Sequence, residues 1–163
     1  MPTFNSVPFF VPPGGMPQVA PQTLLINGPI LQVQIEVPTA LASVLQRDNQ
    51  PIPAPIDGIG LIDTGASITS IDQSVFARLG VNPVGIVQVG TAGGQQQQST
   101  FPAKFNFPGT GLPTIESSAA LGCNLTGQVV MGNKAIIALI GRDLLANCVL
   151  VYNGTTGTFS LSF

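Results

Sequence analysis

Short strands separated by frequent turns are the feature that most limits what this chain can fold into. The clearest strand is residues 30–37 (ILQVQIEV), in which apolar and polar side chains alternate. A period of two is typical of a strand with one buried face. The 19 glycines and 15 prolines among 163 residues favour turns over long helices. We therefore expect one mostly-β, barrel-like domain that is long enough to bury a core.

The same pattern predicts the other strands. They are expected over 56–63, over 87–107 as two strands with a glycine-rich tip, over 127–141 as two strands with a turn at Gly132-Asn133, and over 149–163 as a terminal hairpin with its turn at Asn153-Gly154. Residues 45–55 are predicted to be a turn or loop, so that strands 30–37 and 56–63 form a hairpin ending at Asp63.

Two short helices are expected. In residues 71–80, Asp72 can cap the first turn and Gly80 can end the helix. Residues 142–148 are predicted to form the second helix. Residues 1–23 are rich in proline and carry no charged side chain, so they are predicted to form an extended arm. The phenylalanines of this arm could dock on a partner subunit or fill a groove, and residues 24–163 form the domain itself.

Composition excludes several kinds of chemistry. The chain has no histidine, which rules out Ser-His-Asp and Cys-His catalysis and zinc bound by imidazole. Two cysteines, Cys123 and Cys148, are too few for a zinc cage; we expect free thiols, with a single bridge as the alternative. Only 7% of residues are charged and the net charge is −2, which argues against nucleic-acid binding. Acid–base chemistry is left to seven carboxylates.

One carboxylate, Asp63, stands out because it lies in an apolar run, residues 60–69 (GLIDTGASIT). The glycine at position 65 allows a sharp bend, which would hold the carboxylate at the end of a strand. Taken alone, Asp-Thr-Gly also occurs in ordinary turns and helix caps. The sequence context is more specific, because a glycine-rich hairpin follows about thirty residues later and residues 138–145 (ALIGRDLL) end a later strand.

These three features, in this order, resemble the retropepsin family of retroviral-type aspartic proteases, and the resemblance spans about residues 24–163. It implies a closed β-barrel of the acid protease fold, with one short C-terminal helix, a flap hairpin and a final strand at the ending Phe-Ser-Leu-Ser-Phe. It also implies peptide or protein substrates and no cofactor.

The resemblance implies roles for residues of this chain. Asp63 is catalytic, the Thr64 hydroxyl ties two active-site loops together, and Gly65 and Ala66 line the cleft and bond the substrate backbone. The flap and substrate-binding residues are Val89, Gly90, Thr91, Ala92, Gly93 and Gly94. The second motif is Leu139, Ile140 and Gly141 on a strand beside Asp63, followed by Arg142 and Asp143 at the start of the helix.

The chain departs from the family pattern in places. Ser67 stands where many retroviral enzymes have an aspartate that pairs with the arginine of the later motif, so Arg142 needs another partner. The flap is rich in glutamine, and its glycines could be ordinary hairpin glycines. The arm and segment 108–126 are longer than a minimal retroviral domain requires.

The sequence contains no second Asp-Thr-Gly or Asp-Ser-Gly. Peptide hydrolysis by this chemistry needs two close carboxylates that share one proton, which favours activity at acid pH. A homodimer would supply the pair as Asp63 and its copy. The alternatives are a non-catalytic dimer that binds extended peptides or assembles a larger complex, and a precursor that becomes active once the arm is removed.

Location and modification are less constrained. No apolar run is long enough for a membrane helix, and the N-terminus lacks the basic and apolar regions of a signal peptide. We therefore expect an intracellular protein, or a fragment of a larger one, with no membrane insertion. Residues 124–126 and 153–155 match glycosylation acceptors without a secretory signal to support them.

Overall fold

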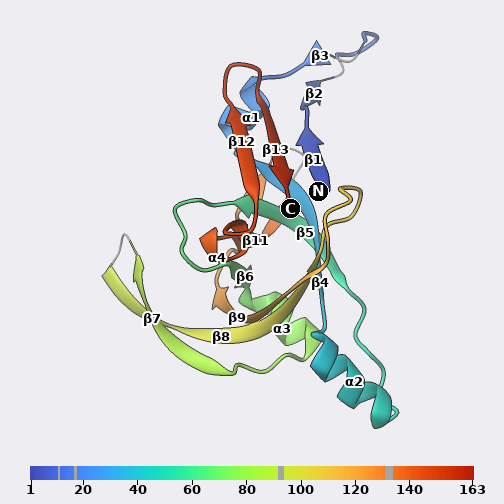
Figure 1. The fold of residues 1–163 in the computed structure, drawn as a ribbon, viewed down its shortest axis with the longest axis vertical. Coiled ribbons are helices and arrows are strands. Elements are labelled where there is room, and N and C mark those ends of the chain that lie inside the picture. The colour runs from blue at the N-terminus through green and yellow to red at the C-terminus, as the bar shows by residue number, and fades with distance from the viewer. Residues whose placement is uncertain (11, 17, 92–93, 131–133) are drawn as a thin grey trace.

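A closed ring of six paired strands forms the centre of the molecule. The computed structural model describes residues 1–10, 12–16, 18–91, 94–130 and 134–163 (Figure 1). Around the ring, each strand pairs with the next and the last pairs with the first: β11 (Lys134–Ile140), β5 (Ile56–Ile62), β4 (Ile30–Glu36), β8 (Gly94–Asn106), β9 (Ile115–Cys123) and β6 (Ser70–Asp72). The predicted mostly-β barrel is therefore confirmed.

Two further strands extend this sheet. β7 (Gly85–Thr91) pairs with β8 to form the expected glycine-rich hairpin, and β10 (Val129–Val130) pairs with β11. The turn predicted at Gly132-Asn133 lies outside the described residues. β9 was not predicted, and it closes the ring by pairing with both β8 and β6.

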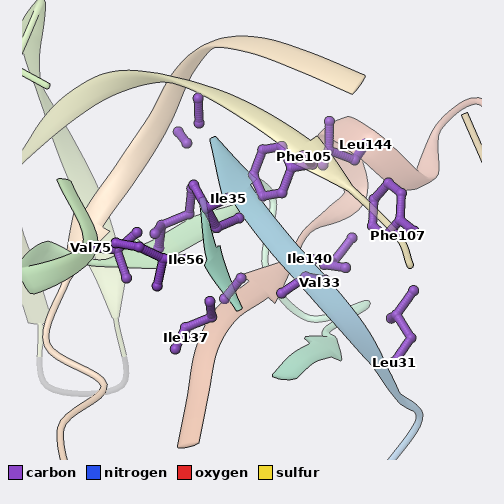
Figure 2. Packing of buried hydrophobic residues seen from close by; sticks show 14 of the residues in the cluster. Leu31, Val33, Ile35, Ile56, Val75, Phe105, Phe107, Ile137, Ile140 and Leu144 are labelled. Atoms are coloured by element: carbon purple, nitrogen blue, oxygen red, sulfur yellow. The ribbon is translucent and has the colours of Figure 1, made fainter. Parts of the chain in front are cut away.

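Alternate side chains of β4 point into the barrel and form part of its core. Leu31, Val33 and Ile35 are buried there, while Gln32 between them is exposed. Ile35 pairs with Ile56 of β5, and Phe105 of β8 pairs with Ile35 from the other side. Figure 2 shows these side chains gathered in one cluster between the strands.

The helices differ most from the predictions. α2 (Thr39–Arg47) lies between β4 and β5, so the prediction of a turn or loop from residue 45 is wrong for residues 45–47. The apolar side chains Leu41, Ala42 and Leu45 share one face of α2 and pack against the core. The two strands still pair as expected.

The other helices are short. α3 (Gln73–Leu79) begins after β6, so residues 71 and 72 belong to a strand and not to the predicted helix. Gly80 ends α3 with a φ of 66°, a left-handed conformation that glycine adopts without strain. α4 (Arg142–Leu145) is shorter than the predicted 142–148. α1 (Gln22–Asn27) was not expected and crosses the proposed boundary between arm and domain.

The two chain termini share a separate sheet. β1 (Thr3–Ser6) pairs with β13 (Thr158–Ser162), which also pairs with β12 (Val149–Asn153). The rings of Phe4 and Phe159 meet edge to face at 5.8 Å between centroids. The hairpin turn spans 154–157, slightly later than predicted. β2 (Phe9–Phe10) pairs with β3 (Gln18–Val19) beyond this sheet.

Both cysteines are free and half-buried, as expected for unpaired thiols. Burial raises the pKa of the Cys123 thiol to about 11 and also raises the pKa of Cys148, so both stay protonated at neutral pH. In the part of the chain that the structure describes, no helix has the length and hydropathy to cross a membrane.

The buried position of Phe105 gives a direct test of the core. Phe105→Ala removes a fully buried ring from the barrel, so it should lower the free energy of unfolding by about 3–5 kcal/mol in urea titrations. Ile52→Ala, at a site that is 49% exposed, is the control and should change it by less than about 0.5 kcal/mol. Equal effects of the two substitutions would contradict this core.

Asp72 predicts a specific pH dependence. Burial alone would raise its pKa, but hydrogen bonds from the Ser74 hydroxyl, the Leu125 N–H and the Ser74 N–H together hold the pKa below its ordinary value. Its ionised form therefore stabilises the fold above the unfolded pKa of about 3.9, and this contribution is lost as pH falls through the lower folded value.

Asp72→Asn should be less stable than the parent near neutral pH, and the gap should narrow below about pH 4. Urea titrations over a pH series measure the gap. A gap that stays constant on acidification would show that the ionised carboxylate does not stabilise the fold in this way.

Candidate active site

Asp63 directly follows β5, where that strand lies parallel to β11. The Asp63 N–H donates to the Ile140 carbonyl at 2.9 Å, which continues the pairing of Leu61 with Leu139 and Ile62 with Ile140. The predicted neighbourhood of the Asp-Thr-Gly turn and the second motif is thus present. Asp63 is half-buried and Thr64 is exposed.

The turn after Asp63 holds the carboxylate in one orientation. Asp63 Oδ1 accepts hydrogen bonds from the Gly65 N–H at 2.9 Å and the Ala66 N–H at 3.2 Å. A Cβ at position 65 would lie 3.1 Å from that oxygen, so a residue larger than glycine would crowd the carboxylate. The turn therefore holds the Asp63 carboxylate in a fixed position through its own backbone N–H groups.

Arg142 holds the outer side of this turn. Its Nη1 donates to the Thr64 carbonyl at 2.7 Å and to the Gly65 carbonyl at 3.0 Å. Its backbone N–H donates to the Ala66 carbonyl at 3.0 Å. Arg142 thus has partners other than residue 67, as the serine at that position led us to expect.

Asp143 holds the far end of the same loop through Thr69. The carboxylate of Asp143 accepts from the Thr69 N–H at 2.9 Å and from the Thr69 hydroxyl at 2.7 Å. The hydroxyl oxygen accepts from the Gly141 N–H at 3.0 Å. Thr69 has no exposed surface, and sequence reasoning missed it, although its place six residues after Asp63 and its hydroxyl were visible.

Gly141 allows the two motifs to meet. A Cβ at this position would lie 2.7 Å from the Ile68 carbonyl carbon and 2.8 Å from the Thr69 nitrogen, both of which are backbone atoms. Any larger residue would push the two segments apart. The second motif is therefore packed directly against the loop that carries Asp63.

Of the residues predicted to form a flap, those that the structure describes lie at the end of the β7–β8 hairpin. Val89 pairs with Gln96, Gly90 with Gln95, and Thr91 with Gly94. Ala92 and Gly93 lie outside the described residues. Among the described residues, the Ile140 carbonyl and Arg142 bond directly to the Asp63 turn, and Asp143 bonds to Thr69 at the far end of the loop.

The described residues include no group of three or more histidine, cysteine, aspartate or glutamate side chains that could hold a metal ion. The chemistry available at this site is that of a carboxylate, backbone N–H groups and the buried threonine behind them.

Comparison with known proteins agrees with this geometry. Residues 57–108, which include Asp63 and the β7–β8 hairpin, match the family model of aspartyl proteases. This match supports the aspartic protease part of the resemblance predicted from the sequence, in the segment that carries Asp63.

Among solved structures, the chain is similar to the solution structure of Simian Foamy Virus (mac) protease. The two share 14% identity and a TM-score of 0.43, over 72% of this chain and 92% of the viral chain. Comparison with curated proteins finds no match.

Thr69→Val tests the buried contact behind the turn. The change keeps the shape but removes the hydroxyl and leaves the Gly141 N–H without its acceptor, so the free energy of unfolding should fall by about 1–3 kcal/mol. Thr155→Val, in the exposed hairpin turn, is the control and should have little effect in the same urea titration. A Thr69→Val protein as stable as the parent would show that this contact does not hold the loop.

Proposed function

We propose that this protein is an aspartic endopeptidase of the retropepsin type, active as a homodimer in which each subunit contributes Asp63. The observation that carries the proposal is the Asp63 carboxylate, fixed by the Gly65 and Ala66 N–H groups in a segment that matches aspartyl proteases. Peptide or protein chains are the substrate class.

The reaction follows from two carboxylates that share one proton. The ionised Asp63 takes a proton from water as the water oxygen bonds to the scissile carbonyl carbon, while the protonated Asp63 of the partner gives its proton to the carbonyl oxygen. Asp63, which now holds the proton from water, then gives it to the scissile nitrogen as the C–N bond breaks, and one hydroxyl of the tetrahedral intermediate returns its proton to the partner's Asp63. The products are an amine and a carboxylic acid, and the pair again shares one proton. No cofactor is required.

The other residues have supporting roles in this proposal. Thr64 is exposed, and in this proposal its hydroxyl joins the turn to its copy. Gly65 and Ala66 present backbone groups to the substrate, and residues 89–94 close over it and exclude water. Leu139, Ile140, Gly141, Arg142 and Asp143 hold the Asp63 turn in place.

Asp63→Asn tests the catalytic role. It removes the group that carries the proton, so peptide-library cleavage should fall by at least about 10³-fold. Asp48→Asn is the matched control. Asp48 is exposed and forms an ion pair with its neighbour Arg47, so the same change there should leave cleavage unaltered. Cleavage by Asp63→Asn at the parent's rate would disprove the proposal.

A second candidate is a non-catalytic dimer that binds extended peptides. The glutamine-rich strand β8, with Gln95 to Gln98 at the flap, favours it over a catalytic flap of the compact glycine type. A stable dimer that binds peptides without turnover between about pH 4 and 7 would support this alternative, and cleavage that depends on Asp63 would exclude it.

A further inference from the structure

The chain contains two Asn-Gly dipeptides, Asn27-Gly28 and Asn153-Gly154, and they lie in different structural settings. Asn27 is the last residue of α1, whereas Asn153 is the last residue of β12. Figure 1 shows the hairpin of β12 and β13 at the end of the molecule opposite α2. An asparagine followed by glycine is chemically labile, because glycine has no Cβ to keep its nitrogen away from the asparagine side chain. The fold therefore presents the same labile dipeptide in two surroundings.

The Asn153 side chain is held by the turn that follows it. Its Oδ1 accepts hydrogen bonds from the Thr155 N–H at 3.1 Å and from the Thr156 N–H at 3.2 Å. A bond of this kind is a common local contact of asparagine in turns. Because the Gly154 nitrogen lies between Asn153 and both donors in the chain, these bonds keep the Asn153 Cγ on the side of that nitrogen.

The Gly154 nitrogen is available to react with this side chain. Residues 153–156 are all exposed, and Gly154 lines a shallow hollow on the surface. In the part of the chain that the structure describes, the Gly154 N–H donates to no acceptor. Water or hydroxide can therefore reach the proton on this nitrogen and remove it.

We propose that Asn153 is a site of spontaneous deamidation, a modification that its own turn promotes. The Gly154 nitrogen, once it has lost its proton to water, bonds to the Asn153 Cγ, and the negative charge of the tetrahedral intermediate falls on Oδ1. The Thr155 and Thr156 N–H groups already donate to this oxygen, so they stabilise the charge as it develops. The inference does not rest on the proposed function, because it involves neither Asp63 nor a second subunit.

Two further steps complete the reaction. The bond between Cγ and the side-chain nitrogen breaks, and this nitrogen takes up a proton and leaves as ammonia, so that a cyclic succinimide remains. Water then adds to one of the two carbonyl carbons of the succinimide and opens the ring, which gives aspartate or isoaspartate. Water is the only co-reactant, and the net change replaces a neutral amide by a carboxylate.

Asn27-Gly28 is protected by its surroundings. The Gly28 N–H donates to the Leu24 carbonyl at 3.0 Å at the end of α1, so removal of this proton would also break that hydrogen bond. The backbone is tightly packed here, since a Cβ at Gly28 would lie 2.8 Å from the Leu61 side chain. We therefore expect the same dipeptide to be stable at position 27.

Deamidation at position 153 changes the terminal hairpin in two ways. Aspartate adds a negative charge to residues 144–163, which contain no charged side chain. Isoaspartate carries the main chain through its Cβ and Cγ and so adds an extra carbon atom to the backbone, at the residue that pairs with Thr158. The isoaspartate form should therefore lose this last pair of the β12–β13 ladder.

Incubation of the folded protein at neutral pH, followed by peptide mapping with mass spectrometry, tests the proposal. In the folded protein, Asn153 should be converted at least about tenfold faster than Asn27, and at least as fast as in the chain unfolded by guanidinium chloride. In the unfolded chain the two dipeptides should react at similar rates, because neither keeps its hydrogen bonds. Conversion of Asn153 that is slower in the folded protein than in the unfolded chain, or a folded ratio no larger than the unfolded one, would overturn the proposal.

Gly154→Ala tests the attacking nitrogen. Gly154 does not have a positive φ, and a Cβ there would lie 3.6 Å from the Tyr152 ring, which is an ordinary contact, so the hairpin should still fold. The added methyl group hinders the approach of the nitrogen to Cγ and should slow the conversion of Asn153 by at least about tenfold, with circular dichroism as the check on folding. An unchanged rate in Gly154→Ala would show that this nitrogen does not attack Asn153.

Discussion

The contact between Thr69 and Asp143 is the interaction on which the rest of the candidate site depends. It joins the loop after Asp63 to the start of α4, two segments 74 residues apart in the sequence. The Thr69 hydroxyl donates to the Asp143 carboxylate and accepts from the Gly141 N–H. This one buried group therefore bonds to two residues of the second motif. A buried polar group is stable only when it is bonded in this way, which makes the arrangement specific.

The parallel pairing of β5 with β11 explains why the Asp63 turn and residues 141–143 can bond to each other. The last residues of the two strands, Ile62 and Ile140, are paired with each other. Asp63 and Gly141, which follow them directly, therefore lie close together. Consecutive residues of α4 then take the two ends of the Asp63 loop, Arg142 at residues 64–65 and Asp143 at residue 69. A four-residue helix thereby holds both ends of the loop that follows Asp63.

The sequence predicted the structure best where apolar and polar side chains alternate along a strand, or where a tight turn requires glycine. Strands β4, β5, β7 and β8 followed from such patterns, and so did the Asp63 turn. β9 was missed because its residues Ile-Glu-Ser-Ser-Ala-Ala-Leu-Gly-Cys lack a clear period of two, and its register with β8 shifts between Phe101 and Ala103. α2 was missed although Leu41 and Leu45 have helical spacing, because its last three residues lead into the proline-rich stretch that was predicted as a turn or loop. Thr69 was missed because its role comes from a contact distant in sequence.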